Sequence, residues 1–264
     1  MTRRVPTKPP IALVALAIVG VLFFLIPIVG LLVQTEWSEL PTHLSSDIVL
    51  DALRLSLIAS VLATVLAAVV GIPIAYVLAR VPFRGKSLVR ALVLLPIVLP
   101  PVVGGAALLF ALGRRGVVGE PLYDATGIVL PFSMAGVVIA VTFVAMPFIV
   151  LTVEAALRNL DVRYEGAAAS LGAGSWTSLR RVTLPLIAPA IVSGLALTWA
   201  RAFGEFGATI TFAGNIQGRT QTMPLAVFVA LESDRGAATA ISLVMVVVAV
   251  LVLVLLRDRW WGKR

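Results

Sequence analysis

Few residues in this sequence could carry out catalysis. The tripeptide Gly85-Lys86-Ser87 matches the end of a phosphate-binding loop, but that pattern also needs a glycine where the sequence has Arg80. His43 is the only histidine, the chain has no cysteine, and Ser193 has no general base near it in the sequence. We therefore expect no catalytic residue, no metal site and no ATP site in this chain.

One pair of charged residues lies within a mostly apolar stretch, LALTWARAFGEFGATITFAGN (195–215). Arg201 and Glu205 are four residues apart, so they share one face of a helix. Ionisable groups are costly within a bilayer, which makes the pair a candidate functional site. The alternative is that the two charges only neutralise each other near the end of the helix. Gly204 and Gly207 are expected to let another backbone approach closely.

A second group of charged residues lies in the segment 154–185, between two apolar stretches. This segment is mostly helix-forming, with a break at Gly172 and Gly174. Its basic residues outnumber its acidic ones: Arg158, Arg163, Arg180 and Arg181 against Glu154, Asp161 and Glu165. A simple turn between two helices needs only a handful of residues. We therefore expect a partner to bind this loop.

The composition determines the class of protein that positions these residues. The chain has 264 residues, of which 60% are hydrophobic and 13% charged, typical of an integral membrane protein. A helix needs about 20 apolar residues to cross a bilayer. Five apolar runs are free of charge, and a sixth starts at residue 186 and must include Arg201 and Glu205. The five are 11–33, 55–79, 91–113, 127–153 and 237–256. We predict an all-α, polytopic membrane protein with six transmembrane helices.

The charge distribution predicts the orientation of these helices. If the helices alternate, one side carries most of the basic residues and the loop 154–185, and the other side carries mainly acidic residues. The basic residues include Arg3, Arg4, Lys8, Arg80, Arg84, Lys86, Arg90, Arg257, Arg259, Lys263 and Arg264. Lysine and arginine are enriched in cytoplasmic loops, which predicts cytoplasmic termini and a cytoplasmic loop 154–185. The net charge of +8 is thus a signal of topology and of contact with membrane lipid, not of nucleic-acid binding.

The third predicted span contains an unusual density of proline and glycine, LLPIVLPPVVGG. Each proline removes an amide donor and leaves a carbonyl that needs another partner. Pro100 and Pro101 therefore predict a bend. That bend either is filled by neighbouring helices or lines a water-filled pathway.

The loop 154–185 resembles the "EAA" segment of ATP-binding-cassette importer permeases. That pattern is Glu-Ala-Ala, three residues, Gly, nine residues and Ile-x-Leu-Pro. Here Gly166-Ala167-Ala168 precedes Gly172 at this spacing, and Val182-Thr183-Leu184-Pro185 follows. Gly166 stands where glutamate is usual, and Glu165 is one residue early. The resemblance implies a short coupling helix that docks on a separate ATPase subunit, which uses the ATP, so that the chain itself binds no cofactor. Gly172 is expected to end this helix.

The resemblance extends from about residue 53 to residue 256, the permease domain. Before it lie the tail, first helix and outer loop of residues 1–52, and after it the basic tail 257–264. LPIVLPPVVGG and RAFGEFGATITFAGN are similar to the oxyanion branch of the family, the molybdate and sulfate/thiosulfate permeases. GNIQGRTQTMPLAVF is more similar to the molybdate permeases.

This resemblance implies a permease for molybdate, with tungstate as a second substrate. It also implies a homodimer with two ATPase subunits and an extracytoplasmic molybdate-binding protein. The residues expected along the pathway are Arg201, Gly204, Glu205, Thr209, Pro100 and Pro101. Two alternatives stay open: a sulfate/thiosulfate permease, and a channel or secondary carrier without an ATPase. The second is disfavoured because Glu205 is the only acid expected within the membrane.

Overall fold

The computed structural model describes residues 10–260. Part of the predicted basic tails, Arg3, Arg4, Lys8, Lys263 and Arg264, lies outside the described residues.

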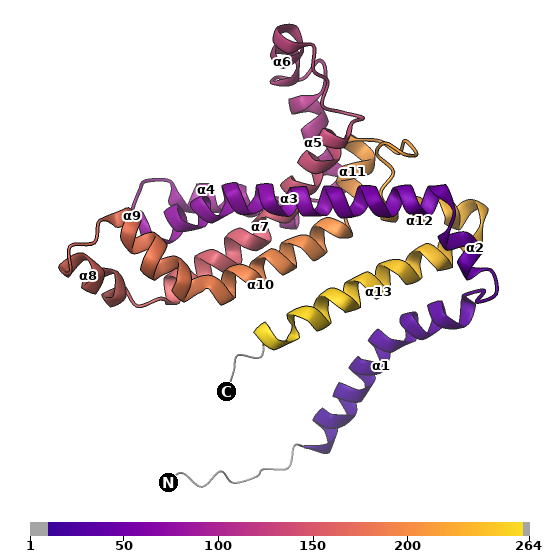
Figure 1. The fold of residues 1–264 in the computed structure, drawn as a ribbon, viewed down its shortest axis with the longest axis horizontal. Helices are drawn as coiled ribbons and strands as arrows, with labels where there is room; N and C mark the ends of the chain where they lie inside the picture. Colours follow the sequence, from indigo (N-terminus) through magenta and orange to yellow (C-terminus); the bar gives the residue numbers. More distant parts are fainter. Residues whose placement is uncertain (1–9, 261–264) are drawn as a thin grey trace.

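The described chain is built of helices (Figure 1). In order they are α1 (Ile11–Gln34), α2 (Leu40–Leu44), α3 (Asp47–Arg80), α4 (Lys86–Val98), α5 (Pro101–Leu112), α6 (Gly119–Thr126), α7 (Met134–Asn159), α8 (Arg163–Ser170), α9 (Ser175–Ser178), the π-helical segment η1 (Leu179–Thr183), α10 (Leu184–Phe203), α11 (Gly207–Phe212), α12 (Met223–Ser233) and α13 (Arg235–Trp260). The predicted all-α fold is confirmed for this part of the chain.

In the part of the chain that the structure describes, five helical stretches are long and apolar enough to cross a membrane: α1, α3, α7, α13 and the continuous helix formed by α9, η1 and α10. The pair α4 and α5 adds a sixth span if it is counted as one broken helix. The prediction of six spans agrees with this count. The predicted bounds differ from the helices mainly at their ends. For example, α3 begins at Asp47, eight residues before the apolar run at 55, because polar and charged residues continue the helix.

The third predicted span, 91–113, is wrong as a single helix. The axes of α4 and α5 differ by 119°, with the break at Leu99 and Pro100. Pro101 then occupies the first turn of α5, where its missing N–H needs no partner. The two adjacent prolines therefore end one helix and start another, instead of bending a continuous one.

Three helices form the centre of the fold. In Figure 1, α7 and α10 run alongside the long helix α3. The side of α3 that faces them is lined by small residues at helical spacing, among them Ala59, Ala63, Ala67, Gly71 and Ala75. A Cβ on Gly71 would lie 2.9 Å from Ile149 of α7, so the backbones approach more closely than larger residues allow. Small residues at helix interfaces are the usual way that membrane helices pack.

The helix α1 packs little against the rest of the chain, with no buried residue among its 24. In Figure 1 it lies beyond α13, away from the centre formed by α3, α7 and α10.

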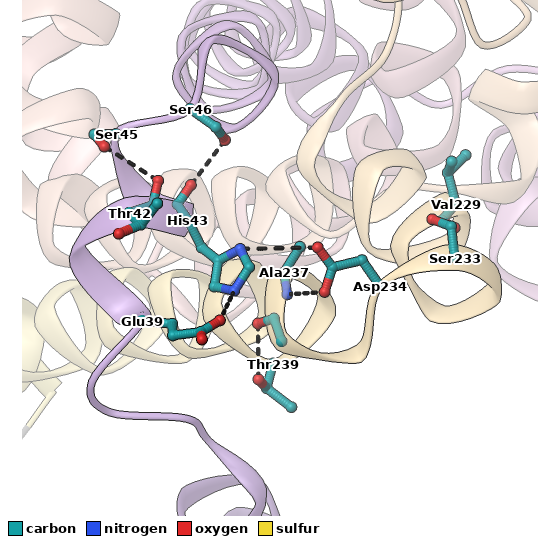
Figure 2. A network of polar contacts seen from close by, with 11 residues as sticks. Glu39, Thr42, His43, Ser45, Ser46, Val229, Ser233, Asp234, Ala237 and Thr239 are labelled. Atoms are coloured by element: carbon teal, nitrogen blue, oxygen red, sulfur yellow. Dashed lines mark hydrogen bonds and ion pairs between the residues drawn. The ribbon is translucent and has the colours of Figure 1, made fainter.

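The two ends of the bundle are made of different elements. In Figure 1, α8 and α9 lie at the left end, whereas α2 and α12 lie at the right end. At the right end, Figure 2 shows the His43 imidazole of α2 between two carboxylates. Its Nε2 is 3.6 Å from Glu39 and its Nδ1 is 3.9 Å from Asp234, at the turn before α13. Asp234 also accepts a hydrogen bond from the amide of Ala237, which caps the start of α13.

Candidate functional site

The loop predicted at 154–185 is shorter in the structure. Helix α7 continues to Asn159, and the next membrane helix begins at Ser175 with α9. The segment between them is 160–174, most of which is α8. The prediction placed both loop boundaries too far into the helices. At the first boundary, Glu154 and Arg158 are paired and so continue α7 without exposing an uncompensated charge. At the second, the side chains of Arg180 and Arg181 are exposed, so the helix continues while their charges reach solvent.

One of these paired residues is Glu154, which the sequence placed in the loop. Its side chain is 6% exposed and lies 3.1 Å from the guanidinium of Arg158, one turn further along α7. Arg90 of α4 also donates two hydrogen bonds to this carboxylate, one of them at 3.3 Å. The spacing of four residues between Glu154 and Arg158 could have predicted half of this cluster, but nothing in the sequence indicates Arg90 as the third member.

The helix α8 ends just before Gly172, as the sequence predicts. Gly172 has a φ of +84°, in the left-handed region that favours glycine. The amide of Ala173 donates to the carbonyl of Ala168, and the amide of Gly172 donates to that of Ala169. These two bonds form a Schellman motif, which satisfies carbonyls that the end of a helix otherwise leaves free.

The outer side of α8 is apolar and exposed. Tyr164 is 54% exposed and Leu171 is 89% exposed, and Ala167, which is also exposed, lies between them on the same helix face. Trp176, in α9, adds a side chain that is 72% exposed. In contrast, Ala168 is buried against the rest of the chain. Gly166 is exposed, with open space where a Cβ would lie.

Glu165 lies on the inner side of α8. Its Oε1 atom is 3.1 Å from the Arg80 guanidinium at the end of α3 and accepts a hydrogen bond of 3.0 Å from the Thr183 hydroxyl. Sequence reasoning found Glu165 but neither of these partners, because Arg80 is 85 residues away along the chain. The predicted Leu184-Pro185 pair directly follows Thr183 and forms the start of α10.

The second predicted site lies where α10 ends. The helix stops at Phe203, so Arg201 is in its last turn and Glu205 lies just beyond it. The prediction that Glu205 belongs to the membrane-spanning helix is therefore wrong. The expected ion pair does form, with 2.5 Å between the Arg201 guanidinium and Glu205 Oε2. The other carboxylate oxygen, Oε1, accepts a hydrogen bond of 2.8 Å from the amide of Ala208 in α11.

The broken third span packs against this site. A Cβ on Gly207 would lie 2.8 Å from Pro101 Cβ, and one on Gly105 would lie 2.8 Å from the carbonyl oxygen of Ala208. The close approach predicted at Gly207 is thus confirmed. The one predicted at Gly204 is wrong, since nothing but Ala200 of its own helix lies within 4 Å of its Cβ position.

Some of the residues predicted to line the transport pathway lie close together in the structure. Pro101 lies against Gly207 at the start of α11, and Glu205 binds the amide of Ala208 in the same helix. The Arg201 side chain is 29% exposed, and Pro100, Pro101 and Gly204 are exposed. Glu205 and Thr209 are buried within the chain. A role of these residues in transport stays a prediction.

Within the described residues, no three His, Cys, Asp or Glu side chains are placed to hold a metal ion. His43 and its two carboxylates lie at the end of the bundle opposite α8 (Figures 1 and 2).

Together, the helical fold, its membrane-length spans and the exposed apolar side of α8 define a multi-span membrane protein with an apolar surface at one end of the bundle. A family model described as the inner membrane component of binding-protein-dependent transport systems matches residues 67–260. The chain belongs to this family, so it is a permease subunit of the cell membrane.

The molybdenum transport system permease protein ModB of Mycobacterium tuberculosis is 45% identical over 237 residues, covering 90% of this chain and 89% of that protein. The ModB protein of Escherichia coli is 43% identical, covering 67% of this chain and 78% of its own length. The sulfate transport system permease protein CysT of Escherichia coli is more distant, at 35% identity over 84% of this chain and 81% of its own length.

Solved structures support the fold. A bacterial ABC transporter that imports the acidic polysaccharide alginate has a chain that matches with a TM-score of 0.75, covering 93% of both chains at 19% identity. A chain of the MetNI methionine ABC transporter matches with a TM-score of 0.62, covering 82% of this chain and 97% of its own length at 17% identity. The predicted fold of an ABC importer permease is therefore confirmed.

Proposed function

We propose that the chain is the membrane-spanning subunit of an ATP-driven importer of molybdate, with tungstate as a second substrate. The observation that carries this proposal is the 45% identity to a molybdenum permease along 90% of the chain, against 35% for the sulfate permease. Tungstate is a tetrahedral dianion of nearly the same size as molybdate, so a pathway that admits one is expected to admit the other.

The ATPase subunit docks on the outer side of α8 in this proposal. Leu171 and Tyr164 expose apolar surface on this short helix. Exposed apolar surface of this kind is typical of a site where another protein binds. The α8 end of the bundle and both termini then lie in the cytoplasm. Two copies of the chain, two ATPase subunits and an extracytoplasmic binding protein form the complete transporter. ATP is bound by the ATPase subunits, and this chain uses no cofactor of its own.

Transport assays test the substrate. Cells that express this chain together with an ATPase subunit and a molybdate-binding protein should accumulate labelled molybdate. An excess of unlabelled tungstate should suppress this uptake, and the same excess of sulfate should leave it largely unchanged. Suppression by sulfate instead would favour a sulfate/thiosulfate permease. Uptake that persists without the ATPase subunit would favour a channel or secondary carrier.

Cysteine labelling tests the orientation, because the native chain has no cysteine. Ser170 is exposed on α8, so Ser170→Cys should react with a membrane-impermeant maleimide only when the cytoplasmic side is accessible. Labelling of intact cells from outside would contradict the proposed topology.

The pathway residues form a separate part of the proposal. Arg201 is partly exposed and supplies positive charge for a dianion, although Glu205 offsets that charge. We expect Arg201→Ala to reduce molybdate uptake while the complex still assembles. Unchanged uptake would limit Arg201 to pairing with Glu205.

A further inference from the structure

The carboxylate of Glu165 joins elements that are far apart in the sequence. It lies on α8 and binds both Arg80, the last residue of α3, and Thr183, the last residue of η1. The same Arg80 guanidinium also donates a hydrogen bond of 3.4 Å to the carbonyl of Leu160, directly after α7. A single group of side chains thus holds α8 against the ends of the three helices that form the centre of the fold.

This group is largely shielded from solvent. The Arg80 side chain is 15% exposed, Glu165 is 25% exposed, and Thr183 is buried. Among the side chains that the structure describes, Glu165 is the only carboxylate within 4.0 Å of the Arg80 guanidinium. The contact is therefore a partly shielded ion pair, in which each partner also makes a second hydrogen bond, Arg80 to Leu160 and Glu165 to Thr183.

Thr183 occupies a special place in its helix. The stretch Ser175–Phe203 is one continuous helix, but Leu179–Thr183 forms a π-helical turn within it. Such turns are uncommon and are frequently found at functional positions, because they place an extra residue in the helix and weaken its regular hydrogen bonding. Glu165 accepts its hydrogen bond from Thr183, the last residue of this turn, directly before α10.

The sequence position of the glutamate in α8 determines which side of the helix its side chain faces. The family pattern places a glutamate at 166, and this chain has it at 165. One residue corresponds to a rotation of about 100° around a helix. Here the acid shares the inner side of α8 with the buried Ala168, away from Tyr164 and Leu171.

We propose that Glu165 is a positioning residue for transport: it transmits the movement of α8 to α3 and to the π turn at the start of α10. This inference rests on the proposed function, in which an ATPase subunit moves α8. Glu165 does not contact that subunit. It makes the helices of this chain follow α8 when α8 moves.

The test uses the complete transporter, reconstituted in proteoliposomes, and measures the number of molybdate ions transported per ATP hydrolysed. We expect Glu165→Ala to retain the ATPase subunit and ATP hydrolysis but to lower this ratio about tenfold, which lies within the usual range for the coupling between two parts of a protein. Thr183→Val leaves α8 itself unchanged and should lower the ratio by a smaller factor. The double variant Arg80→Glu with Glu165→Arg should recover part of the loss.

Glu232→Gln is the matched control, because Glu232 is exposed and forms no ion pair within the described residues. Its ratio should equal that of the unsubstituted complex. A normal ratio in Glu165→Ala or in Thr183→Val would overturn the proposal. Loss of the ATPase subunit from Glu165→Ala would also overturn it, by assigning Glu165 to the docking surface.

Failure of the proposed function gives a different result. In that case the unsubstituted complex itself shows no ATP-dependent molybdate transport. The Glu165 proposal fails only when the unsubstituted complex is active and a variant behaves as described above.

Discussion

Glu165 and Glu205 each pair with an arginine and each bind a second element, but the partners of Glu165 are distant in the sequence and those of Glu205 are close. Glu205 contacts Arg201 and Ala208, so all of its partners lie within eight consecutive residues of the chain. Glu165 contacts Arg80 and Thr183, which lie 85 and 18 residues away. The first carboxylate fixes the local geometry of one break in a helix. The second determines how separate helices lie relative to one another.

The difference predicts which property of the protein depends on each carboxylate. Glu205 is 1% exposed, so its charge and its hydrogen bonds are needed for the break between α10 and α11 to fold. Glu165 is partly solvated, and α3, α7 and α10 pack together in an apolar core that does not include it. Loss of Glu205 should therefore affect stability first, and loss of Glu165 should affect coupling between helices.

Substitution of Glu205 should have the largest effect on stability. In Glu205→Ala, Arg201 loses its partner and the amide of Ala208 loses its acceptor. Breaking one side of a buried ion pair costs about 3 to 5 kcal/mol, and we expect about 3 because Arg201 keeps some access to solvent. A thermal unfolding midpoint measured in detergent should fall accordingly.

The double variant Arg201→Ala with Glu205→Ala is the control for this effect. It removes the unpaired charge, so part of the lost stability should return. If Glu205→Ala alone unfolds at the same temperature as the unsubstituted chain, the local role assigned to Glu205 is wrong.

At the break between α10 and α11, Gly207 lies against Pro101 of α5. Substitution of Gly207 should therefore have the next largest effect on stability. The Cβ of Gly207→Ala would lie 2.8 Å from Pro101 Cβ and 3.2 Å from the amide nitrogen of Val102. Such overpacking costs about 1 to 3 kcal/mol. Gly204→Ala is the matched control, three residues earlier, because its Cβ meets nothing closer than 3.7 Å. Equal unfolding midpoints for the two alanine variants would contradict the close contact between α5 and α11.

On the α8 side, Gly172 should matter for partner binding more than for global stability. Its φ of +84° strains any other residue, at about 1 to 2 kcal/mol. We expect Gly172→Val to unwind the end of α8 and to reduce the amount of ATPase subunit that co-purifies. Gly174→Val is the control, because Gly174 has a φ of −69° and open space at its Cβ position. Full retention of the ATPase by Gly172→Val would count against docking at α8.

The sequence predicts the features that depend on local chemistry. Apolar runs predict the spans, Gly172 predicts the end of α8, and the spacing of Arg201 and Glu205 predicts their ion pair, because each of these depends on neighbouring residues. It does not predict Arg80 and Thr183 as partners of Glu165, since those contacts depend on how α3, α8 and α10 pack. The bend at Pro100 and Pro101 is predicted correctly, but the angle of 119° between two separate helices is not, for a related reason. Proline predicts a bend, but the contacts of α5 with α11 decide its angle.

The smallest effect on stability is expected for Glu165→Ala, and this result separates the two carboxylates most sharply. Partly exposed ion pairs contribute up to about 1 kcal/mol, so the unfolding midpoint should fall far less than in Glu205→Ala. The two variants should be measured side by side in the same detergent, since the detergent itself changes the midpoint. If Glu165→Ala destabilises the protein as much as Glu205→Ala does, then Glu165 is needed to fold the α8 end of the bundle, and a loss of transport in that variant says nothing about coupling. If the midpoint is nearly unchanged while transport per ATP falls, then the carboxylate acts on the relative movement of folded helices. The long-range contacts of Glu165 predict this second result.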